Sequence, residues 1–312
     1  AIRVHQRPGP TLLDLLAELR PELAIAGDGV AKPGSAPVVP RGNLPAARDR
    51  FLGRATELAE LTGRIREGAR LIALLGLGGS GKTRLATEAA RGLHGEPSGG
   101  AWFFDLSEAR SIDGICFSVA RGLGLALDRN DPVAQVGHAL RALGRTLLIF
   151  DNLEQCVDHL PETLGRWRAL APEAVWVCTS RVSLRLPGDR AVFVGPLTAD
   201  DGVALFLDRS PVGIPTADRS EVRSLVETLE GFPLAIELAA ARTRLLPVSE
   251  IRRRLTLDLR VLGGGGEDRP ERHRSVEGSL RWSWELLSGS ARSALAQLSS
   301  FCLLYTSDAA DE

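Results

Sequence analysis

The sequence contains no methionine and one tyrosine, and its two lysines are Lys32 and Lys82. Nearly every basic residue is therefore an arginine, and Lys82 stands out against that composition. Because the chain begins at Ala1 and lacks methionine, we interpret it as an internal fragment of a longer protein. Its function has to be inferred from a middle piece.

Long apolar stretches are also missing. No run of apolar residues approaches the roughly 20 residues that a membrane-spanning helix needs, and the N-terminal residues have no signal-peptide pattern. The five histidines have no metal-ligand spacing. The four cysteines have no spacing typical of a metal site or a disulfide framework, and we expect them to be small buried residues. They are Cys116, Cys156, Cys178 and Cys302. These absences predict a cytoplasmic protein that does not bind a membrane.

The charges nearly cancel, with 38 basic and 39 acidic residues and a formal net charge of -1. This balance excludes an overall electrostatic attraction to nucleic acid. A run of arginines at 252–254 is better explained as a solvated helix face than as a nucleic-acid site. With 312 residues, of which 44% are hydrophobic, the chain can bury a substantial core in two or three structural units.

From residue 51 onward, short apolar segments alternate with amphipathic helical patterns. This alternation predicts βα units, and hence an α/β fold with a parallel sheet flanked by helices. The expected strands are 71–75, 101–106, 146–150, 174–178 and 191–194.

Helical patterns alone follow residue 197. Thr198 and Asp201 form a capping box that begins the first of these helices, and Pro233 lies near the start of another. We therefore predict four regions before residue 302. They are the end of an upstream domain with a linker at 1–45, a nucleotide-binding domain at 46–197, a helical domain at 198–262 and a truncated third domain at 263–301.

The motif G-x-x-x-x-G-K-T begins at Gly76, directly after an expected strand and at the start of an expected helix, which is the context of a P-loop. The N–H groups of such a loop surround phosphate oxygens, its lysine reaches the β- and γ-phosphates, and its threonine binds Mg²⁺. A glycine-rich turn without a ligand is the rejected alternative. The motif predicts binding of ATP or ADP with Mg²⁺ by Gly76, Gly78, Gly79, Ser80, Gly81, Lys82, Thr83 and Arg84.

Asp151 lies at the end of the apolar segment 147–150. A strand that ends in aspartate is ordinary by itself, but beside a P-loop it predicts a carboxylate that holds Mg²⁺ through water. Asn152 follows, where many P-loop ATPases have an acidic general base. The role of activating water then falls to Glu154, or hydrolysis is weak. Glu154 is equally well explained as a solvated loop carboxylate.

Arg181 follows the expected strand 174–178 by way of Thr179 and Ser180. A guanidinium at the carboxyl edge of the sheet could contact a γ-phosphate and so distinguish ATP from ADP. The alternative is a surface arginine, and the P-loop favours the sensor.

Six motifs occur in order: Phe51-Leu52-Gly53-Arg54, the P-loop, Phe150-Asp151-Asn152, Thr179-Ser180-Arg181, Gly231-Phe232-Pro233-Leu234-Ala235 and Trp282-Ser283-Trp284-Glu285-Leu286-Leu287. Together they resemble the STAND-class signal-transduction ATPases with an NB-ARC-like core, especially the large bacterial ATP-binding transcriptional regulators of the LuxR and AfsR type. The resemblance covers residues 43–301. It implies a P-loop NTPase sheet flanked by helices, then a small helical (ARC1-like) domain and the start of a winged-helix domain.

The resemblance also implies further contacts with the nucleotide. The Phe-Leu-Gly-Arg segment packs beside the adenine in such proteins, so Leu52, Gly53 and Arg54 are expected to bind the nucleotide. Ala55 stands where the family usually has glutamate, which leaves only backbone contacts expected there. Pro233 is expected to lie against the adenine of ADP, although it is also explained as a proline in the first turn of a helix.

The third domain and the C-terminal residues are interpreted separately. The winged-helix domain of such regulators closes over the nucleotide in the resting state, yet Trp282 and Trp284 are also explained as core or interface residues. After Phe301 the helical pattern ends, and a permitted back-translation of 302–312 spells a sequencing adapter. We interpret 302–312 as a non-native tail, with a genuine acidic terminus as the alternative.

The sequence therefore predicts an ATP/ADP-binding molecular switch with slow ATP hydrolysis, in which ADP holds the domains closed and ATP opens them. The expected catalytic residues are Lys82, Asp151, Glu154 and Arg181, and Thr83 and Asp151 are expected to bind Mg²⁺. By resemblance, repeats downstream of the fragment are expected to sense a protein or small-molecule signal, and DNA is expected to be bound only by domains outside it. A nucleotide-dependent oligomer is an open alternative to a monomer. The alternatives are an ADP-stabilised scaffold with negligible hydrolysis and, less favoured, a small-molecule P-loop kinase.

Overall fold

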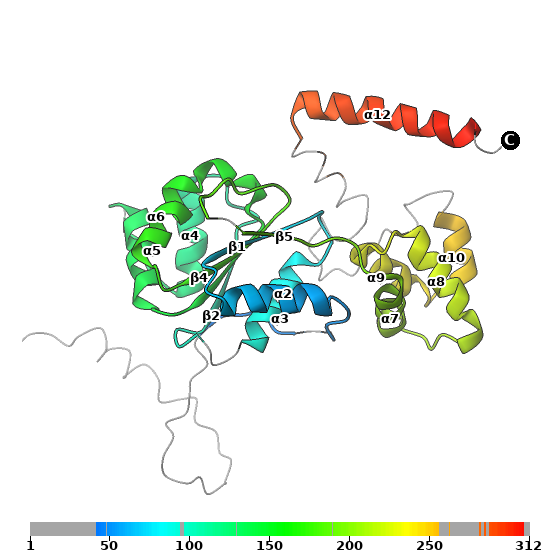
Figure 1. The fold of residues 1–312 in the computed structure, drawn as a ribbon, viewed down its shortest axis with the longest axis horizontal. Helices are drawn as coiled ribbons and strands as arrows, with labels where there is room; N and C mark the ends of the chain where they lie inside the picture. Colours follow the sequence, from blue (N-terminus) through cyan, green and yellow to red (C-terminus); the bar gives the residue numbers. More distant parts are fainter. Residues whose placement is uncertain are drawn as a thin grey trace, which may run out of the picture. The chain divides into compact units, whose positions relative to one another are not determined.

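The computed structural model describes residues 42–47, 49–93, 97–128, 130–188, 190–255, 262, 281, 284 and 287–308. Most of the expected upstream domain and linker, and most of the expected start of the winged helix, lie outside these residues. The described part from residue 42 contains a sheet unit and a helical unit (Figure 1).

A five-stranded parallel sheet in the order β2-β3-β4-β1-β5 forms the centre of the sheet unit. Its strands are β1 (Leu71–Leu75), β2 (Ala101–Asp105), β3 (Leu147–Asp151), β4 (Val175–Ser180) and β5 (Arg190–Phe193). Every residue of β1 and β3 is buried, as expected for continuous apolar strands covered on both faces. All five strands predicted from the sequence are confirmed, β1 with the predicted ends and the other four with ends shifted by one or two residues.

Helices cover both faces of the sheet (Figure 1). One apolar core joins one face to α2 (Ala55–Arg66) and α3 (Lys82–Gly92). The other joins the opposite face to α4 (Ile112–Leu123), α5 (Pro132–Ala142) and α6 (Arg166–Leu170). Cys116, Cys156 and Cys178 are buried in this second core. The sheet therefore lies between two helical layers, with all its carboxyl ends at one edge.

Phe150 lies at the centre of an aromatic cluster just before the end of β3. Its ring centroid is 5.1 Å from that of Phe104, 5.3 Å from that of Trp176 and 6.3 Å from that of Trp167. Close aromatic packing of this kind fixes side chains and backbone in the core. The cluster therefore holds the next residue, Asp151, at a defined position on the sheet edge.

Between β3 and α6 the chain forms three short turns of helix. These are the 3₁₀ turns η1 (Leu153–Gln155) and η2 (Val157–His159), and the π turn η3 (Pro161–Gly165). Asn152 initiates η1 with a left-handed backbone (φ 64°). The turn places Glu154 just beyond Asp151, on the same side of the sheet as the P-loop residues described below.

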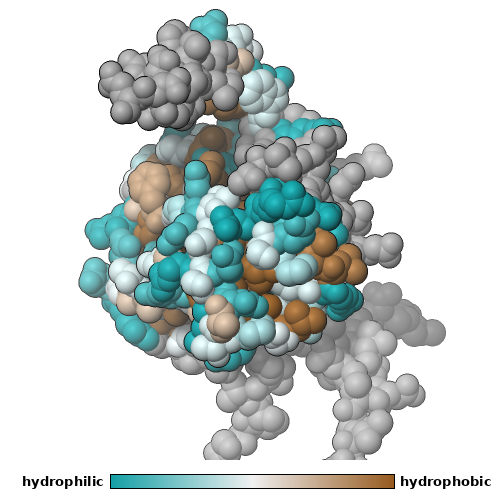
Figure 2. Space-filling model, turned by 90° about the vertical axis from the view of Figure 1, so that its right-hand side faces the viewer, coloured by the Kyte–Doolittle hydropathy of each residue, from teal (hydrophilic) through white to brown (hydrophobic). Residues whose placement is uncertain are grey.

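The helical unit consists of α7 (Ala199–Arg209), η4 (Thr216–Asp218), α8 (Arg219–Thr228), α9 (Pro233–Arg242) and α10 (Val248–Leu255) around a core of its own. Thr198 caps α7 by accepting a hydrogen bond from the Asp201 N–H at 3.1 Å, which confirms the predicted capping residue. Pro233 is the first residue of α9, as predicted. Brown hydrophobic areas are separated by teal hydrophilic ones on the face that carries this unit (Figure 2).

The last described element is α12 (Gly289–Asp308). The prediction that the helical pattern ends after Phe301 is wrong, because α12 continues to Asp308. The residues that follow include the strong helix formers Leu303 and Leu304 and no proline or glycine before residue 309. The interpretation of 302–312 as non-native stays a prediction. No helix in the described ranges is both long and apolar enough to cross a membrane.

Candidate functional site

The P-loop connects β1 to α3 at the carboxyl edge of the sheet. Gly81 precedes α3, and Lys82 is its first residue. The amino group of Lys82 donates hydrogen bonds to the carbonyl oxygens of Gly76 and Leu77, both at 2.9 Å. The lysine therefore lies across the loop, at the position where a P-loop lysine meets phosphate oxygens.

The protonation of Lys82 depends on its surroundings. Burial lowers the pKa of its amino group to about 8, and the negative charge of Glu154 is the largest opposing influence. A bound phosphate would bring further negative charge beside the ammonium and favour its protonated form. The site is thus arranged for an anionic ligand.

Thr83 and Asp151, the two residues predicted to bind Mg²⁺, are brought together by the fold. The Thr83 hydroxyl donates to Asp151 Oδ1 at 2.6 Å, and the Thr179 hydroxyl donates to the same oxygen at 2.5 Å. The Asn152 side-chain amide donates to Asp151 Oδ2 at 2.9 Å. Asp151 is only 5% exposed. Hydroxyl and carboxylate oxygens are the ligands that Mg²⁺ prefers, so this pair fits the ion.

Burial raises the pKa of Asp151 to about 6, although the hydrogen bonds from Thr179 and Thr83 oppose the shift and the charge of Asp105 adds to it. A metal ion binds only the charged carboxylate. Protons and Mg²⁺ therefore compete for Asp151 in a range close to neutral pH.

Asp105 is a neighbour of the site that sequence reasoning missed. It ends β2, next to β3, and accepts hydrogen bonds from the Asn152 side-chain amide at 3.1 Å and from the Ser107 N–H at 2.9 Å. Asn152 thus lies between two carboxylates, those of Asp105 and Asp151. The available signal was that β2, like β3, ends in an aspartate.

Arg181 and Glu154 form a buried ion pair. The distance from Arg181 Nε to Glu154 Oε1 is 3.1 Å, and their side chains are 7% and 3% exposed. The two alternative interpretations from the sequence are therefore wrong. Glu154 is not a solvated loop carboxylate, and Arg181 is not a surface residue. Their predicted roles as base and sensor remain predictions.

Two glycines of the P-loop allow other groups to approach closely. A Cβ on Gly78 would overlap the guanidinium of Arg181. A Cβ on Gly79 would lie 2.8 Å from Leu234 Cβ, and Gly79 has φ +82°, which favours glycine. The Leu234 N–H also donates to the Gly79 carbonyl at 3.3 Å. The start of α9 therefore packs directly on the P-loop.

The segment before α2 is tied to the same place by Arg54. Its guanidinium donates to the carbonyl oxygens of Ser80 at 2.7 Å and Gly195 at 2.6 Å and pairs with Glu57 at 2.8 Å, and the residue is 4% exposed. The side chain of Arg54 therefore supports the loop from within the protein. Gly53 has φ +71° and lies against the side chain of Asp201 in α7.

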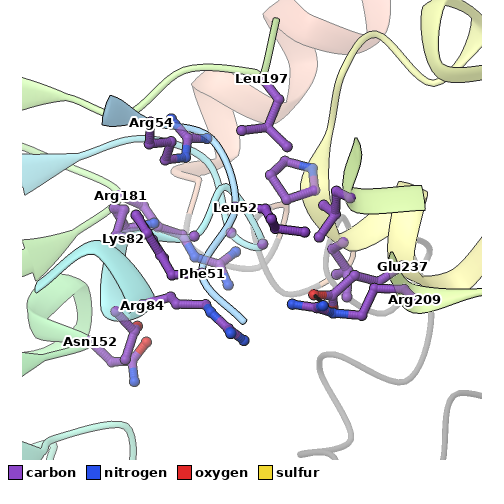
Figure 3. A pocket seen from close by; sticks show the side chains of 17 residues that line it. Phe51, Leu52, Arg54, Lys82, Arg84, Asn152, Arg181, Leu197, Arg209 and Glu237 are labelled. Carbon is purple, nitrogen blue, oxygen red and sulfur yellow. Dashed lines mark ion pairs between the residues drawn. The ribbon is translucent and has the colours of Figure 1, made fainter. Parts of the chain in front are cut away.

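A cavity of about 290 Å³ lies between the sheet unit and the helical unit. Apolar side chains surround its middle, the P-loop closes one end, and polar side chains lie at the other (Figure 3). It is lined by Phe51, Leu52, Arg54, Gly78, Gly79, Gly81, Lys82, Thr83, Arg84, Asn152, Arg181, Leu197, Leu205, Arg209, Pro233, Leu234 and Glu237. Most of the predicted binding residues thus share one cavity, and Gly76, Ser80, Asp151 and Glu154 contact or adjoin its lining residues.

Arg209 and Glu237 lie at the far end of the cavity, and sequence reasoning did not single them out. Arg209 Nε is 3.5 Å from Glu237 Oε1, and the two side chains lie next to each other (Figure 3). Arg209 and Arg84 each donate to the carbonyl oxygen of Arg50 at 2.8 Å. One backbone oxygen therefore links α7, α3 and the segment before α2 around the cavity.

The cavity matches the chemistry of a nucleoside phosphate. Ser80 Oγ is buried in the loop and has no hydrogen-bond partner among the described residues. Phosphate oxygens satisfy such donors in P-loops, and an apolar middle section accommodates a base. The parallel sheet, the P-loop and the acidic strand end together define a P-loop ATPase domain.

Comparison with known proteins agrees with this class. Residues 65–185 match the family model described as AAA domain. An uncharacterized protein of Mycobacterium tuberculosis is 31% identical over 259 residues, which are 80% of this chain and 65% of that protein. AfsR, a regulatory protein of Streptomyces griseus, is 27% identical over 73% of this chain and 25% of its own length. A protein of M. tuberculosis that carries the name of a proposed HTH-type transcriptional regulator is 30% identical over 74% of this chain and 27% of its own length.

Among solved structures, a Walker-type ATPase of Pyrococcus abyssi matches with a TM-score of 0.50 and 16% identity over 68% of this chain and 74% of that protein. A STAND protein with a tetratricopeptide repeat sensor from Pyrococcus horikoshii matches with a TM-score of 0.45 and 16% identity over 81% of this chain and 35% of that protein. Residues 65–185 thus match an AAA-type P-loop domain within a stretch similar to AfsR-type regulators, and the predicted resemblance to such regulators is confirmed. It spans about 65% of the length of the uncharacterized mycobacterial relative and about a quarter of the regulators.

We expect Gly79→Ala to loosen the contact between the P-loop and α9, because the new Cβ would meet Leu234 and the backbone would be strained. The free energy of unfolding, measured in urea, should fall by roughly 1–3 kcal/mol. Gly63→Ala is the matched control, because a Cβ there meets nothing within 4 Å inside α2 and should stabilise the helix slightly. Equal effects at both positions would contradict the proposed contact.

Mg²⁺ binding should depend on pH through Asp151. Since the pKa of Asp151 is raised to about 6, lowering the pH to 5 protonates most of the carboxylate and should weaken Mg²⁺ roughly tenfold relative to pH 7.5. Calorimetric titration of the nucleotide-loaded chain with Mg²⁺ measures this effect. Asp151→Asn is the control, because it reports the pH dependence of the nucleotide alone. A wild-type profile identical to that of Asp151→Asn would exclude Asp151 from the ion site.

Proposed function

We propose that this chain is the part of a bacterial signal-responsive regulator that binds a nucleotide and responds to which nucleotide is bound. The chain would bind ADP or ATP with Mg²⁺ in the cavity between the sheet unit and the helical unit. The observation that carries the proposal is the contact of α9 with the P-loop, through Gly79 and Leu234. A nucleotide held there touches both units, so its identity can change how they pack.

The residues around the cavity support distinct roles. Lys82 and the N–H groups of the loop would hold the phosphates. Thr83 and Asp151 would hold Mg²⁺, which would neutralise negative charge on the phosphate oxygens when bound. Leu52 and Pro233 lie in the apolar middle section, where the adenine would fit. Arg181 lies over Gly78 and would sense a third phosphate.

Slow hydrolysis is supported by the surroundings of Glu154. Asn152 has no carboxylate to accept a proton, and its side-chain amide donates hydrogen bonds to Asp105 and Asp151. Glu154 is paired with Arg181. A general base needs a free carboxylate within reach of the attacking water. This arrangement favours a switch with slow turnover, and it also supports the second candidate, a scaffold that ADP stabilises and that hydrolyses no ATP.

The names of two relatives support a proposal for the output of the whole protein. AfsR and the HTH-type protein are named as regulators, and this chain corresponds to about a quarter of each. We infer a transcriptional output, with DNA bound by domains outside this chain and a protein or small-molecule signal received by segments downstream of it. A nucleotide-dependent change of oligomeric state would connect the two.

Lys82→Ala should abolish nucleotide binding, because it removes the cation that faces the phosphates. We expect the Kd for ADP, measured by calorimetry, to rise by roughly a hundredfold or more. Lys32→Ala, at the other lysine of the chain, is the matched control and should leave the Kd unchanged. Unchanged affinity in Lys82→Ala would refute the site.

Single-turnover hydrolysis of ATP separates the switch from the scaffold. The switch requires a measurable rate with excess protein, and Glu154→Gln should lower that rate by roughly a hundredfold if Glu154 is the base. A wild-type rate equal to that of Lys82→Ala would support the scaffold. A measurable rate that Glu154→Gln leaves untouched would show that another group activates water.

A further inference from the structure

The Arg181–Glu154 pair has a buried carboxylate oxygen without a partner. Arg181 Nε contacts Glu154 Oε1, whereas Glu154 Oε2 is buried and has no hydrogen-bond partner in the described part of the chain. A buried charge is costly unless its hydrogen bonds are satisfied. Glu154 is therefore incompletely satisfied, because its second carboxylate oxygen is buried without a hydrogen bond.

The pair lies where a third phosphate would be bound. The Arg181 guanidinium packs on Gly78 in the P-loop and lines the cavity, near the Lys82 side chain (Figure 3). The amino group of Lys82 is bonded to the carbonyl oxygens of Gly76 and Leu77, on the same stretch of loop. A γ-phosphate at this position would meet the cation of Arg181 and the anion of Glu154 together.

ADP and ATP differ in whether their phosphates compete with Glu154 for Arg181. A diphosphate can occupy the loop while Arg181 stays on Glu154. A triphosphate adds negative charge and oxygen acceptors beside Arg181, and guanidinium groups form bidentate hydrogen bonds with phosphate. Glu154 and the γ-phosphate are thus alternative partners for one arginine.

Building on the proposed nucleotide site, we propose that Glu154 competes with the γ-phosphate for Arg181, so that the ion pair favours ADP and ATP has to break it. Glu154 is in this respect a positioning residue that acts through Arg181. The pair also keeps Glu154 from serving as a base until a γ-phosphate has taken Arg181. The resting preference for ADP and the delay of hydrolysis then have one cause.

Calorimetric titrations of the 312-residue chain with ADP and with the non-hydrolysable ATP analogue AMP-PNP, both with Mg²⁺, test this proposal. Glu154→Gln should improve the affinity for AMP-PNP relative to ADP by roughly tenfold. Arg181→Gln should weaken AMP-PNP and leave ADP nearly unchanged. In the double variant the effect of Glu154→Gln should disappear, because its partner is gone.

Controls keep the outcomes distinct. Glu221→Gln removes a carboxylate that pairs with Arg252 at 3.2 Å in the helical unit and should change neither affinity. Thermal unfolding without nucleotide checks that each variant folds. Glu154→Asp, which keeps the charge but shortens the side chain, should shift the ratio in the same direction by less and replaces Glu154→Gln if the latter does not fold.

Equal changes in both affinities, or an effect of Glu154→Gln that persists without Arg181, would overturn the competition while leaving the nucleotide site intact. A wild-type chain that binds neither ADP nor AMP-PNP would instead contradict the proposed function, and the competition with it.

Discussion

The contact between the P-loop and α9 is the constraint on which the rest of the site depends. The Gly79 carbonyl accepts a hydrogen bond from the Leu234 N–H at 3.3 Å, and the absence of a side chain on Gly79 lets Leu234 pack against the loop. Without that approach, Pro233 would not line the same cavity as Lys82. The glycines of this P-loop therefore serve two purposes, since they expose N–H groups to phosphate and admit a second structural unit.

A second set of contacts fixes the carboxyl edge of the sheet. The aromatic cluster around Phe150 holds the end of β3, and Thr83 and Thr179 both donate to the Asp151 carboxylate that follows. Because Asp151 is buried, its charged form is costly and a metal ion would offset that cost. The buried Asp151 carboxylate thus supports the proposed Mg²⁺ site at this edge.

The fold was largely predictable because continuous apolar strands and a P-loop are local signals. The same holds for Thr198 and Pro233, whose roles at helix starts depend on neighbouring residues. Contacts between distant segments could not be predicted. In the sequence, Arg209 and Glu237 have the pattern of ordinary polar residues on surface helices. Only the folded structure shows that they lie at the end of the cavity. Arg54, expected beside the adenine, donates hydrogen bonds to the Ser80 and Gly195 carbonyls, which lie 26 and 141 residues further along the chain.

We propose that one cavity, shared by the P-loop and the helical unit, binds a nucleotide and distinguishes two phosphates from three. A crystal structure of the chain with ADP and Mg²⁺ would show this site directly. We expect the diphosphate within the loop, Thr83 and Asp151 around Mg²⁺, the adenine against Pro233, and Arg181 still paired with Glu154. An adenine bound away from Pro233 would refute the shared cavity as the nucleotide site, and Arg181 on the diphosphate with Glu154 left alone would refute the competition for Arg181.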